Sequence, residues 1–359
     1  MRLEDFERLA SLYGVDLDEV LLLALNLHGI WSTLPRHRAR LRLRVATVQA
    51  TPWLVIVPLN RSRSPFRLDG ETVRAGCGAP VATVTRVEAD DAVGGYFRDQ
   101  GRALTLNPNA RSRCTGCAFC PNTLEAAADP RLTHDPGLAG LLRALTSMHP
   151  AGELAGVREV TVSTGCFERE PLAVDHVVRL RRALTRSGVD VRARVGLLTS
   201  VVRARAAFEQ LAEWAAPFVL RLTVECFTRR ELLLKHSKAT LAVEAMPGLL
   251  EQACAAGLGT SCNVIVGLDS LDDLVAGIHQ LLPRMSEFPN LQVFQAHTPL
   301  MDALRAEGAD QLGFYLEARQ RLEALLAPTG LRPAGWENYR PLWYTAFAGS
   351  PLDVADAPE

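Results

Sequence analysis

A short cysteine loop decides the fold: residues 113–121 read RCTGCAFCP. Its three thiols, Cys114, Cys117 and Cys120, follow the spacing Cys-x2-Cys-x2-Cys, and the whole chain has eight cysteines. Thiolates are soft ligands that suit zinc or iron–sulfur clusters. Because so short a loop keeps its three sulfurs close together, we expect it to hold one metal centre.

Four kinds of site are compatible with this loop. A structural zinc site needs four ligands, and His134, His149 or Cys166 would have to supply the fourth. A ferredoxin-type cluster has a further cysteine three residues on, where this chain has Leu124. A loop without metal is the third alternative. The fourth is a [4Fe–4S] cluster that three cysteines hold, with one iron left open.

Strands and helices alternate regularly after residue 103. The apolar pattern predicts strands at 103–106, 159–163, 191–198, 218–224, 262–267 and 291–295, and helices at 138–148, 173–187, 202–215, 241–256, 271–282 and 301–327. Such alternation favours an α/β fold with a parallel sheet and right-handed crossovers. Six units do not reach the eight of a closed barrel, and the pattern alone leaves a doubly wound sheet possible. In either fold, ligands bind at the carboxyl ends of the strands.

The first hundred residues have a different pattern. Helical apolar spacing occurs at 3–12 and 16–28, and strand-like runs occur at 41–48, 53–59 and 81–87. We therefore expect an α+β extension over residues 1–102.

The position and ending of the cysteine loop resemble those of the radical S-adenosylmethionine (SAM) superfamily. The loop follows the first strand of a six-unit βα chain, and Cys117-Ala118-Phe119-Cys120 is similar to the family's Cys-x-aromatic-Cys ending. The family usually has three residues between its first two cysteines, and this chain has two. The resemblance covers residues 103–300. It implies a partial (βα)6 TIM-like barrel, with residues 1–102 as the N-terminal extension and 301–359 as a last helix and an aromatic capping segment.

The resemblance also implies the chemistry. Cys114, Cys117 and Cys120 would hold a [4Fe–4S] cluster whose open iron binds SAM, and reduction would cleave a carbon–sulfur bond to give an organic radical. The expected reaction is hydrogen abstraction from a small-molecule substrate by the 5′-deoxyadenosyl radical. An alternative is transfer of the 3-amino-3-carboxypropyl group of SAM to a soft acceptor, sulfur or arsenic. An alternative of another class is a non-catalytic iron–sulfur electron-transfer protein or a zinc protein.

The residues that follow the strands are candidates for the SAM site. Gly165 stands where the family has a Gly-rich turn, which a tight strand-to-helix turn also explains. Glu225 would be costly after an apolar strand unless it is paired, and either a contact to the SAM ribose or an ion pair with arginine accounts for it. Lys235 holds the SAM carboxylate or belongs to a solvated turn. By resemblance we expect the cofactor to be bound by Phe119, Thr164, Gly165, Glu168, Glu225, Lys235, Asn263, Gly267 and Gln295.

Two further cysteines follow strands. Cys166 comes after the second predicted strand and Cys226 after the fourth. Each is explained as a small buried apolar residue. The alternative is a thiol pair that takes part in catalysis by binding substrate, forming a thiyl radical or capturing a soft atom.

Composition limits the surroundings in which the chain works. The formal net charge is −1, so charge gives no support for a nucleic-acid partner. The sequence has no apolar run long enough to span a bilayer and no signal peptide at its start. We therefore expect a cytoplasmic protein whose partners are a small-molecule substrate and an electron donor such as flavodoxin or ferredoxin. Only two of the 39 basic residues are lysines, Lys235 and Lys238, a bias that we attribute to codon usage.

Overall fold

The computed structural model describes residues 1–34, 38–45, 52–59, 63–89, 95–106, 116–120, 135–163, 167, 169–335 and 340–352. The chain divides into two compact units. Unit 1 comprises residues 1–90, 265–276 and 291–357, and unit 2 comprises residues 91–264, 277–290 and 358–359. None of the helices in the described ranges is both long enough and apolar enough to cross a membrane.

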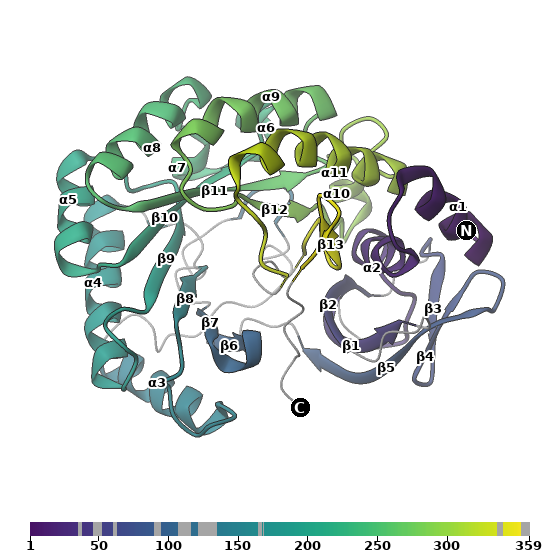
Figure 1. Cartoon of the computed structure of the whole chain (residues 1–359), viewed down its shortest axis with the longest axis horizontal. Coiled ribbons are helices and arrows are strands. Elements are labelled where there is room, and N and C mark those ends of the chain that lie inside the picture. Colours follow the sequence, from purple (N-terminus) through teal and green to yellow (C-terminus); the bar gives the residue numbers. More distant parts are fainter. Residues whose placement is uncertain are drawn as a thin grey trace. The chain divides into compact units, whose positions relative to one another are not determined.

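A seven-stranded sheet with the order β12-β11-β10-β9-β8-β7-β6 carries the βα units (Figure 1). Its strands are β6 (Gly95–Arg98), β7 (Ala103–Leu106), β8 (Glu159–Val162), β9 (Arg194–Thr199), β10 (Phe218–Glu225), β11 (Gly259–Val266) and β12 (Asn290–Val293). Strands β7 to β11 pair in parallel, and β6 joins β7 antiparallel. The sequential order and the curl of the sheet are those of a partial TIM-like barrel, which confirms the predicted fold class.

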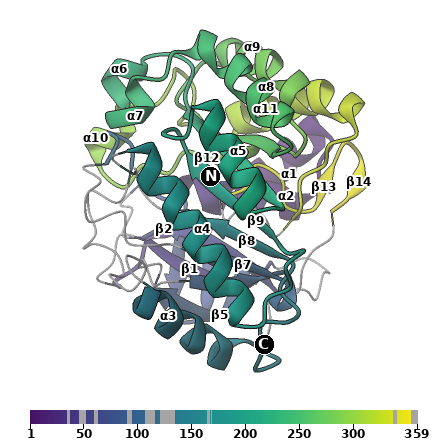
Figure 2. The same cartoon turned by 90° about the vertical axis from the view of Figure 1, so that its left-hand side faces the viewer.

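Helices follow the strands of this sheet. They are α3 (Asp135–Met148), α4 (Glu170–Arg186), α5 (Arg205–Trp214), α6 (Arg230–Leu233), α7 (His236–Ala239), α8 (Met246–Ala255), α9 (Leu271–Leu281), α10 (Pro299–Asp302) and α11 (Leu312–Leu326). Short 3-10 turns are η1 (Asp99–Gly101), η5 (Val243–Ala245), η6 (Leu282–Arg284) and η7 (Ala327–Thr329). Helices α3, α4 and α5 lie in front of β7, β8 and β9 in Figure 2.

The helices differ from the predicted ones at two places. The predicted helix 301–327 is two helices, α10 and α11, and the predicted helix 241–256 begins only at Met246, after η5. Both regions carry the apolar residues of a helix. In the region 301–327, however, Gly308 lies between α10 and α11 and adopts a φ of 77°. This left-handed conformation ends a helix and suits glycine.

One face of β10 and β11 is polar although both strands are buried. Arg221 is in register with Ser261, and Thr223 with Asn263, so these four side chains share a face. At most 4% of any of them is exposed. A strand that is buried on both faces is usually a continuous apolar run. The polar alternation here indicates a face that packs hydrogen-bonding groups against one another.

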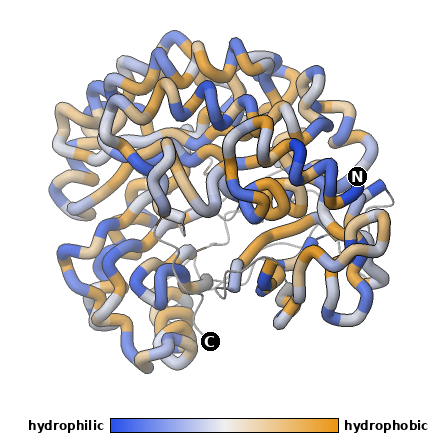
Figure 3. Tube along the Cα trace, turned by 45° about the vertical axis from the view of Figure 1, so that its right-hand side comes forward, coloured by the Kyte–Doolittle hydropathy of each residue, from blue (hydrophilic) through white to orange (hydrophobic). Residues whose placement is uncertain are grey.

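Unit 1 contains a five-stranded antiparallel sheet of order β2-β1-β5-β4-β3. The strands are β1 (Arg38–Val45), β2 (Trp53–Pro58), β3 (Phe66–Asp69), β4 (Thr72–Ala75) and β5 (Pro80–Ala89), and the helices α1 (Leu3–Tyr13) and α2 (Leu17–His28) precede them. Figure 3 colours the chain by hydropathy; α2 is largely hydrophobic, whereas β1 alternates arginines with apolar residues. The predicted α+β character of this region is therefore present, with β3 and β4 as strands that the sequence pattern did not indicate.

The C-terminal segment packs into unit 1 around a buried carboxylate. Glu19 of α2 is 0% exposed. It accepts backbone hydrogen bonds from Tyr344 at 2.7 Å and Thr345 at 2.6 Å, and it forms an ion pair with Arg319 of α11 at 2.9 Å. Beyond this cluster, the hairpin of β13 (Ala346–Phe347) and β14 (Ser350–Pro351) closes the segment. These contacts compensate the cost of burying the carboxylate.

Candidate functional site

Glu225 ends β10 in a backbone conformation that few glutamates adopt. Its φ of 67° is left-handed, which costs a non-glycine residue about 1–3 kcal/mol. The pairing of β10 with β11 shifts just before it, because Thr223 is in register with Asn263 and Glu225 with Val264. Such a bulge re-aims the next side chain. Only 7% of the Glu225 side chain is exposed, so its charge requires partners.

Arg230 fixes the backbone around this strand end. Its guanidinium donates to the carbonyls of Val224 at 2.7 Å, Lys238 at 2.7 Å and Leu241 at 3.1 Å, and also to that of Cys226. A planar guanidinium with several donors is well suited to gathering carbonyls from separate segments. It therefore joins the end of β10 to the last turn of α7 and to the residues directly after that helix; β10 and α7 are labelled in Figure 1.

The carboxylate of Glu225 has one charged and one neutral partner. Lys238 forms an ion pair with Oε1, and the side-chain amide of Asn263 donates to Oε2 at 2.8 Å. The carbonyl of Asn263 in turn accepts from the side-chain amide of Asn290 at 2.9 Å. A row of side chains thus runs from β12 through β11 to β10. Because both Asn263 groups are engaged, its amide is held in one orientation.

The described part of the cysteine loop is a tight turn attached to α6. The backbone N–H of Cys120 donates to the carbonyl of Cys117 at 2.9 Å, and Gly116 before it has a φ of 75°. The N–H of Ala118 donates to the carbonyl of Leu233 at 2.9 Å. The last turn of α6 therefore supports the loop, which brings two thiols of the motif to the region that follows β10.

Cys117 lies in the same electrostatic environment as the Glu225 pair. Burial raises the pKa of its thiol to about 11, the ammonium of Lys238 opposes this rise, and Glu225 adds to it. The backbone N–H of Lys235 also donates to the sulfur. A metal-bound thiolate is negative, and the N–H and the ammonium would favour that charge. The thiols of Cys117 and Cys120 thus fit a soft metal centre. Among the residues that the structure describes, no group of three metal-ligating side chains is complete.

The structure describes some of the predicted site residues in unit 2 and not others. Phe119 is 7% exposed, and Cys226, directly after Glu225, is fully buried. The side chain of Lys235 is exposed, so the ion pair with Glu225 is made by the chain's other lysine. The predictions on Cys114, Thr164, Gly165, Cys166 and Glu168 fall outside the described residues.

Two predicted cofactor residues lie in unit 1. Gly267 has a φ of 108°, and a side chain there would meet the hydroxyl of Tyr315. Gln295 is 0% exposed, and its amide nitrogen lies 2.6 Å from the side-chain oxygen of Asn26 and 2.6 Å from the carbonyl of Ile56. Contacts inside unit 1 therefore account for the glycine at 267 and for the amide at 295.

Sequence reasoning missed three residues of the site: Lys238, Arg230 and Asn290. The sequence contains one indication of Lys238: almost all basic residues of the chain are arginines, and its only two lysines are at positions 235 and 238. Nothing in the spacing distinguished Lys238 from Lys235, and no sequence pattern distinguishes Arg230 from the many other arginines. Their roles depend on which atoms the fold brings within hydrogen-bond distance.

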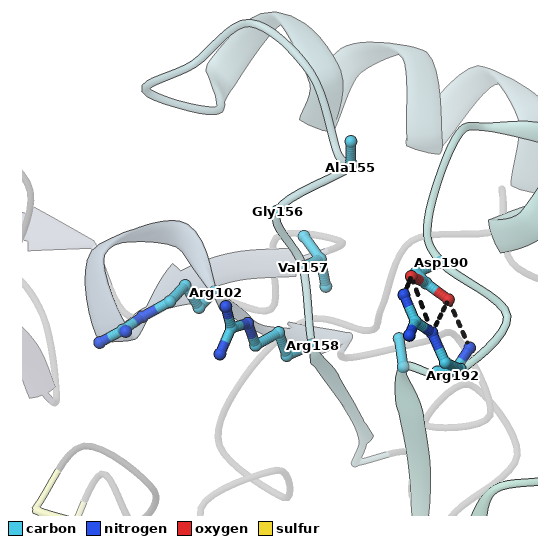
Figure 4. A pocket seen from close by; sticks show the side chains of 8 residues that line it. Arg102, Ala155, Gly156, Val157, Arg158, Asp190 and Arg192 are labelled. Atoms are coloured by element: carbon cyan, nitrogen blue, oxygen red, sulfur yellow. Dashed lines mark hydrogen bonds and ion pairs between the residues drawn. The ribbon is translucent and has the colours of Figure 1, made fainter.

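A concave region lies at the amino ends of the strands, opposite to the end that Glu225 occupies (Figure 4). It is a cavity of about 600 Å³ just before β8 and β9, lined by Arg102, Arg158, Asp190 and Arg192 among others. Arg192 forms an ion pair with Asp190 at 2.8 Å, and this bonding lowers the pKa of Asp190 to about 2. In α/β barrels the amino ends of the strands serve stability and the carboxyl ends serve catalysis. We therefore place the candidate site at the end of β10.

Comparison with known proteins gives likenesses of fold. No protein-family model matches the chain, and no curated protein sequence matches it. Among solved structures, it is similar to the coproporphyrinogen III oxidase HemN of Escherichia coli, a radical SAM enzyme, with 17% identity, a TM-score of 0.42 and coverage of 63% of this chain and 52% of that one. It is also similar to SuiB of Streptococcus suis bound to S-adenosylmethionine, with 12% identity, a TM-score of 0.39 and coverage of 64% and 48%.

A further similar structure is HydG, a maturase of the [FeFe]-hydrogenase, with 12% identity, a TM-score of 0.44 and coverage of 71% of this chain and 60% of that one. The chain spans about half the length of the first two of these structures. At such identities the likeness describes the arrangement of strands and helices and assigns no residue of this chain.

Proposed function

We propose that this protein is a radical SAM enzyme that acts on a small molecule in the cytoplasm, where cysteines are kept reduced. The observation that supports the proposal is the juxtaposition of the Cys117 turn with Glu225 and Lys238. Soft ligands for a cluster and a buried carboxylate for a polar cofactor thus occupy one place, beyond the carboxyl end of a barrel strand.

Each described residue has a task in this proposal. Cys117 and Cys120, with Cys114, hold a [4Fe–4S] cluster, which when reduced supplies the electron that cleaves a carbon–sulfur bond of SAM. Glu225 accepts hydrogen bonds from hydroxyl or amino groups of SAM. A carboxylate has about four acceptor positions, and Lys238 and Asn263 use one oxygen each. Glu225 and Lys238 are largely buried, which limits the access of water to this carboxylate.

The side chains that hold Glu225 act by positioning it. Lys238 and Asn263 fix the two carboxylate oxygens, and Arg230 fixes the carbonyls before and after the residue. A ligand therefore meets an acceptor whose orientation is already set, and less freedom is lost on binding. This is the reason we expect SAM affinity to depend on Glu225 more than on any exposed carboxylate nearby.

The test is to reconstitute the protein anaerobically with iron and sulfide, reduce it with dithionite, add SAM and identify the products by mass spectrometry. 5′-Deoxyadenosine supports hydrogen abstraction, and 5′-methylthioadenosine above a no-protein control supports aminocarboxypropyl transfer, which the buried Cys226 thiol beside Glu225 would suit. Four bound irons with neither product and no effect of SAM on the EPR spectrum of the cluster would contradict the enzyme proposal.

A variant pair sharpens this test. Glu225→Gln removes the charge of the acceptor, and we expect the Kd for SAM to rise about 10- to 100-fold, because hydrogen bonds to charged groups contribute about 1.5–3 kcal/mol. The matched control is Glu231→Gln, which makes the same change at an exposed position six residues further on. Equal SAM affinity in both variants would exclude Glu225 from the site.

A further inference from the structure

Three arginines stand just before three neighbouring strands of the seven-stranded sheet. Arg102 directly precedes β7, Arg158 directly precedes β8, and Arg192 lies two residues before β9. The backbone N–H of Arg158 donates to the carbonyl of Arg102 at 2.7 Å. All three arginines line the cavity of about 600 Å³ at the amino ends of the strands (Figure 4). The order of the strands in the sheet therefore gathers three positive charges around one hollow of the surface.

The carboxylates beside this cavity do not balance the arginines. Arg192 donates to both oxygens of Asp190, and Arg102 forms an ion pair with Asp99 at 2.7 Å. Arg158 is exposed and forms no ion pair with any residue that the structure describes. Three cations thus face two carboxylates, and like charges held this close together repel one another. A bound anion would remove this repulsion.

The three guanidinium groups keep donors for such an anion. Arg102 and Arg192 each use Nε and one terminal nitrogen for their aspartate partners, and within the described part of the chain the second terminal nitrogen makes no hydrogen bond. Arg158 has its whole guanidinium to offer. An arginine carries five N–H donors in a planar fork, whose geometry matches the oxygens of a phosphate group.

The wall of the cavity is buried and fixed by hydrogen bonds. Val157 is 1% exposed and Ala193 is 3% exposed. The backbone N–H of Val157 donates to the carbonyl of Leu154 at 3.1 Å, and the carbonyl of Ala193 accepts from the buried guanidinium of Arg181 at 2.7 Å. The volume of the cavity lies within the range of about 300–1,000 Å³ that is usual for small-molecule sites. Its shape therefore suits a small molecule.

We propose that this cavity binds a small molecule through a diphosphate group held by Arg102, Arg158 and Arg192. Neighbouring strands lie about 4.8 Å apart, so two linked phosphates reach more of the three arginines than one phosphate does. The chain as a whole has a net charge of −1, so the attraction comes from this cluster and not from a general positive field. The site is independent of the proposed function, because Glu225 lies at the other end of the barrel strands.

Titration calorimetry of the full chain with inorganic diphosphate, at constant ionic strength, tests the site. Arg158→Met should raise the Kd for diphosphate about tenfold, as expected for the loss of hydrogen bonds to a charged group. Arg158→Lys keeps the charge but not the fork, so it should have a smaller effect. Inorganic phosphate should bind the wild type about tenfold more weakly than diphosphate does, and equal affinities would contradict a diphosphate site.

A second variant should change the affinity in the opposite direction. Asp190→Asn removes a negative charge from the cavity and releases the guanidinium of Arg192. The amide oxygen can still accept the backbone N–H of Arg192, which the carboxylate accepts at 2.8 Å, so the local backbone is kept. We expect the Kd for diphosphate to fall about threefold. Diphosphate should also raise the melting temperature of the wild type, and that of Arg158→Met less, because a ligand of the folded state stabilises it.

Two controls make the same changes away from the cavity. Arg143→Met alters an exposed arginine of α3 that does not line it, and Asp175→Asn breaks an exposed ion pair with Arg179 on α4. Both should keep the wild-type Kd. If Arg143→Met weakens binding as much as Arg158→Met, or if Asp190→Asn leaves the affinity unchanged, diphosphate is bound by scattered surface charge and the cavity is not its site.

Discussion

Strand β10 carries two buried charge clusters that are built in different ways. In its middle, Arg221 forms ion pairs with Glu159 at 3.5 Å and Glu287 at 3.1 Å, and Arg194 forms ion pairs with the same two carboxylates at 2.7 and 2.6 Å. At its end, Glu225 has one ammonium and one amide as partners. Among the described residues, two arginines therefore form ion pairs with both acids in the middle of the strand, whereas the ion pair described for Glu225 at the end is the one with Lys238.

The backbone differs as well. Arg221 lies in regular register with β9 and β11, whereas Glu225 follows a bulge and has a left-handed φ. A cluster with several mutual partners on regular strands stabilises the fold. Backbone strain that surrounding contacts hold in place is typical of functional sites. The comparison teaches that burial of charge alone does not identify a site, and that backbone conformation and the number of partners distinguish the two clusters.

The largest effect is expected from breaking the middle cluster. Arg221→Met should lower the free energy of unfolding by about 3–5 kcal/mol, because it removes the more deeply buried of the two arginines that pair with Glu159 and Glu287. Chemical denaturation followed by circular dichroism measures it. The matched control is Arg194→Met, since 47% of that side chain is exposed and its loss should cost about 1 kcal/mol or less. Equal losses in both variants would contradict the view that Arg221 is the central cation.

A smaller loss of stability is expected when the contact between α9 and the loop that follows β10 is disturbed. A side chain at Gly277 of α9 would meet the ring of Phe227, two residues after Glu225. Gly277→Ala should therefore cost about 1–3 kcal/mol of stability through overpacking and weaken SAM binding by displacing the loop. Thermal unfolding and SAM titration measure the two effects.

The control for this variant is another helical glycine. Gly248 of α8 has nothing within 4 Å of where a Cβ would be. Gly248→Ala should therefore stabilise the protein by up to about 1 kcal/mol, through helix propensity alone. A stabilising Gly277→Ala would show that Phe227 moves away freely and that the loop is not fixed by this contact.

The row of amides offers a finer test of the strand end. Asn290→Asp replaces the donor to the carbonyl of Asn263 by an acceptor. Whichever way the Asn263 amide then turns, one of its neighbours is a carboxylate facing its oxygen, so Glu225 or residue 290 loses a hydrogen bond. We expect the Kd for SAM to rise about tenfold, which corresponds to one hydrogen bond of about 1 kcal/mol or slightly more. Asn290→Ala, which only removes the donor, should have a smaller effect, and an equal or larger one would refute the relay.

The smallest effect concerns pH and belongs to the middle cluster. Burial alone would raise the pKa of Glu159, but Arg221, Arg98 and Arg194 outweigh it and hold this pKa below the ordinary value of 4.5. The unfolded chain therefore binds the proton more readily, so the ionised carboxylate stabilises the fold above pH 4.5, and this contribution is lost as pH falls through the native pKa. The free energy of unfolding should fall with acid in the wild type and less steeply in Glu159→Gln. The exposed Glu153→Gln serves as the control and should keep the wild-type slope.

Much of the fold follows from local patterns. Alternating apolar periods located β7 to β12 and their helices within a few residues, because strand and helix periods depend on neighbouring positions along the chain. The predicted strand 262–267 begins three residues later than β11, which starts at Gly259. The residues left out include the polar Thr260 and Ser261, and nothing in the sequence shows that each will find a partner. The pattern also missed β6, whose short run gains its place only by pairing with β7.

The candidate site likewise has features that the sequence determines and features that only the fold determines. The sequence by itself determined the cysteine spacing and the presence of a carboxylate after β10, because both are fixed by adjacent residues. Only the tertiary structure decided that Lys238 pairs with Glu225 while Lys235 stays exposed, and that Arg230 and Asn290 support the pair. Such choices depend on distances between segments that lie apart in the chain. Because electrostatic and hydrogen-bond energies fall steeply with distance and burial, two lysines three residues apart acquire different surroundings only once the chain has folded.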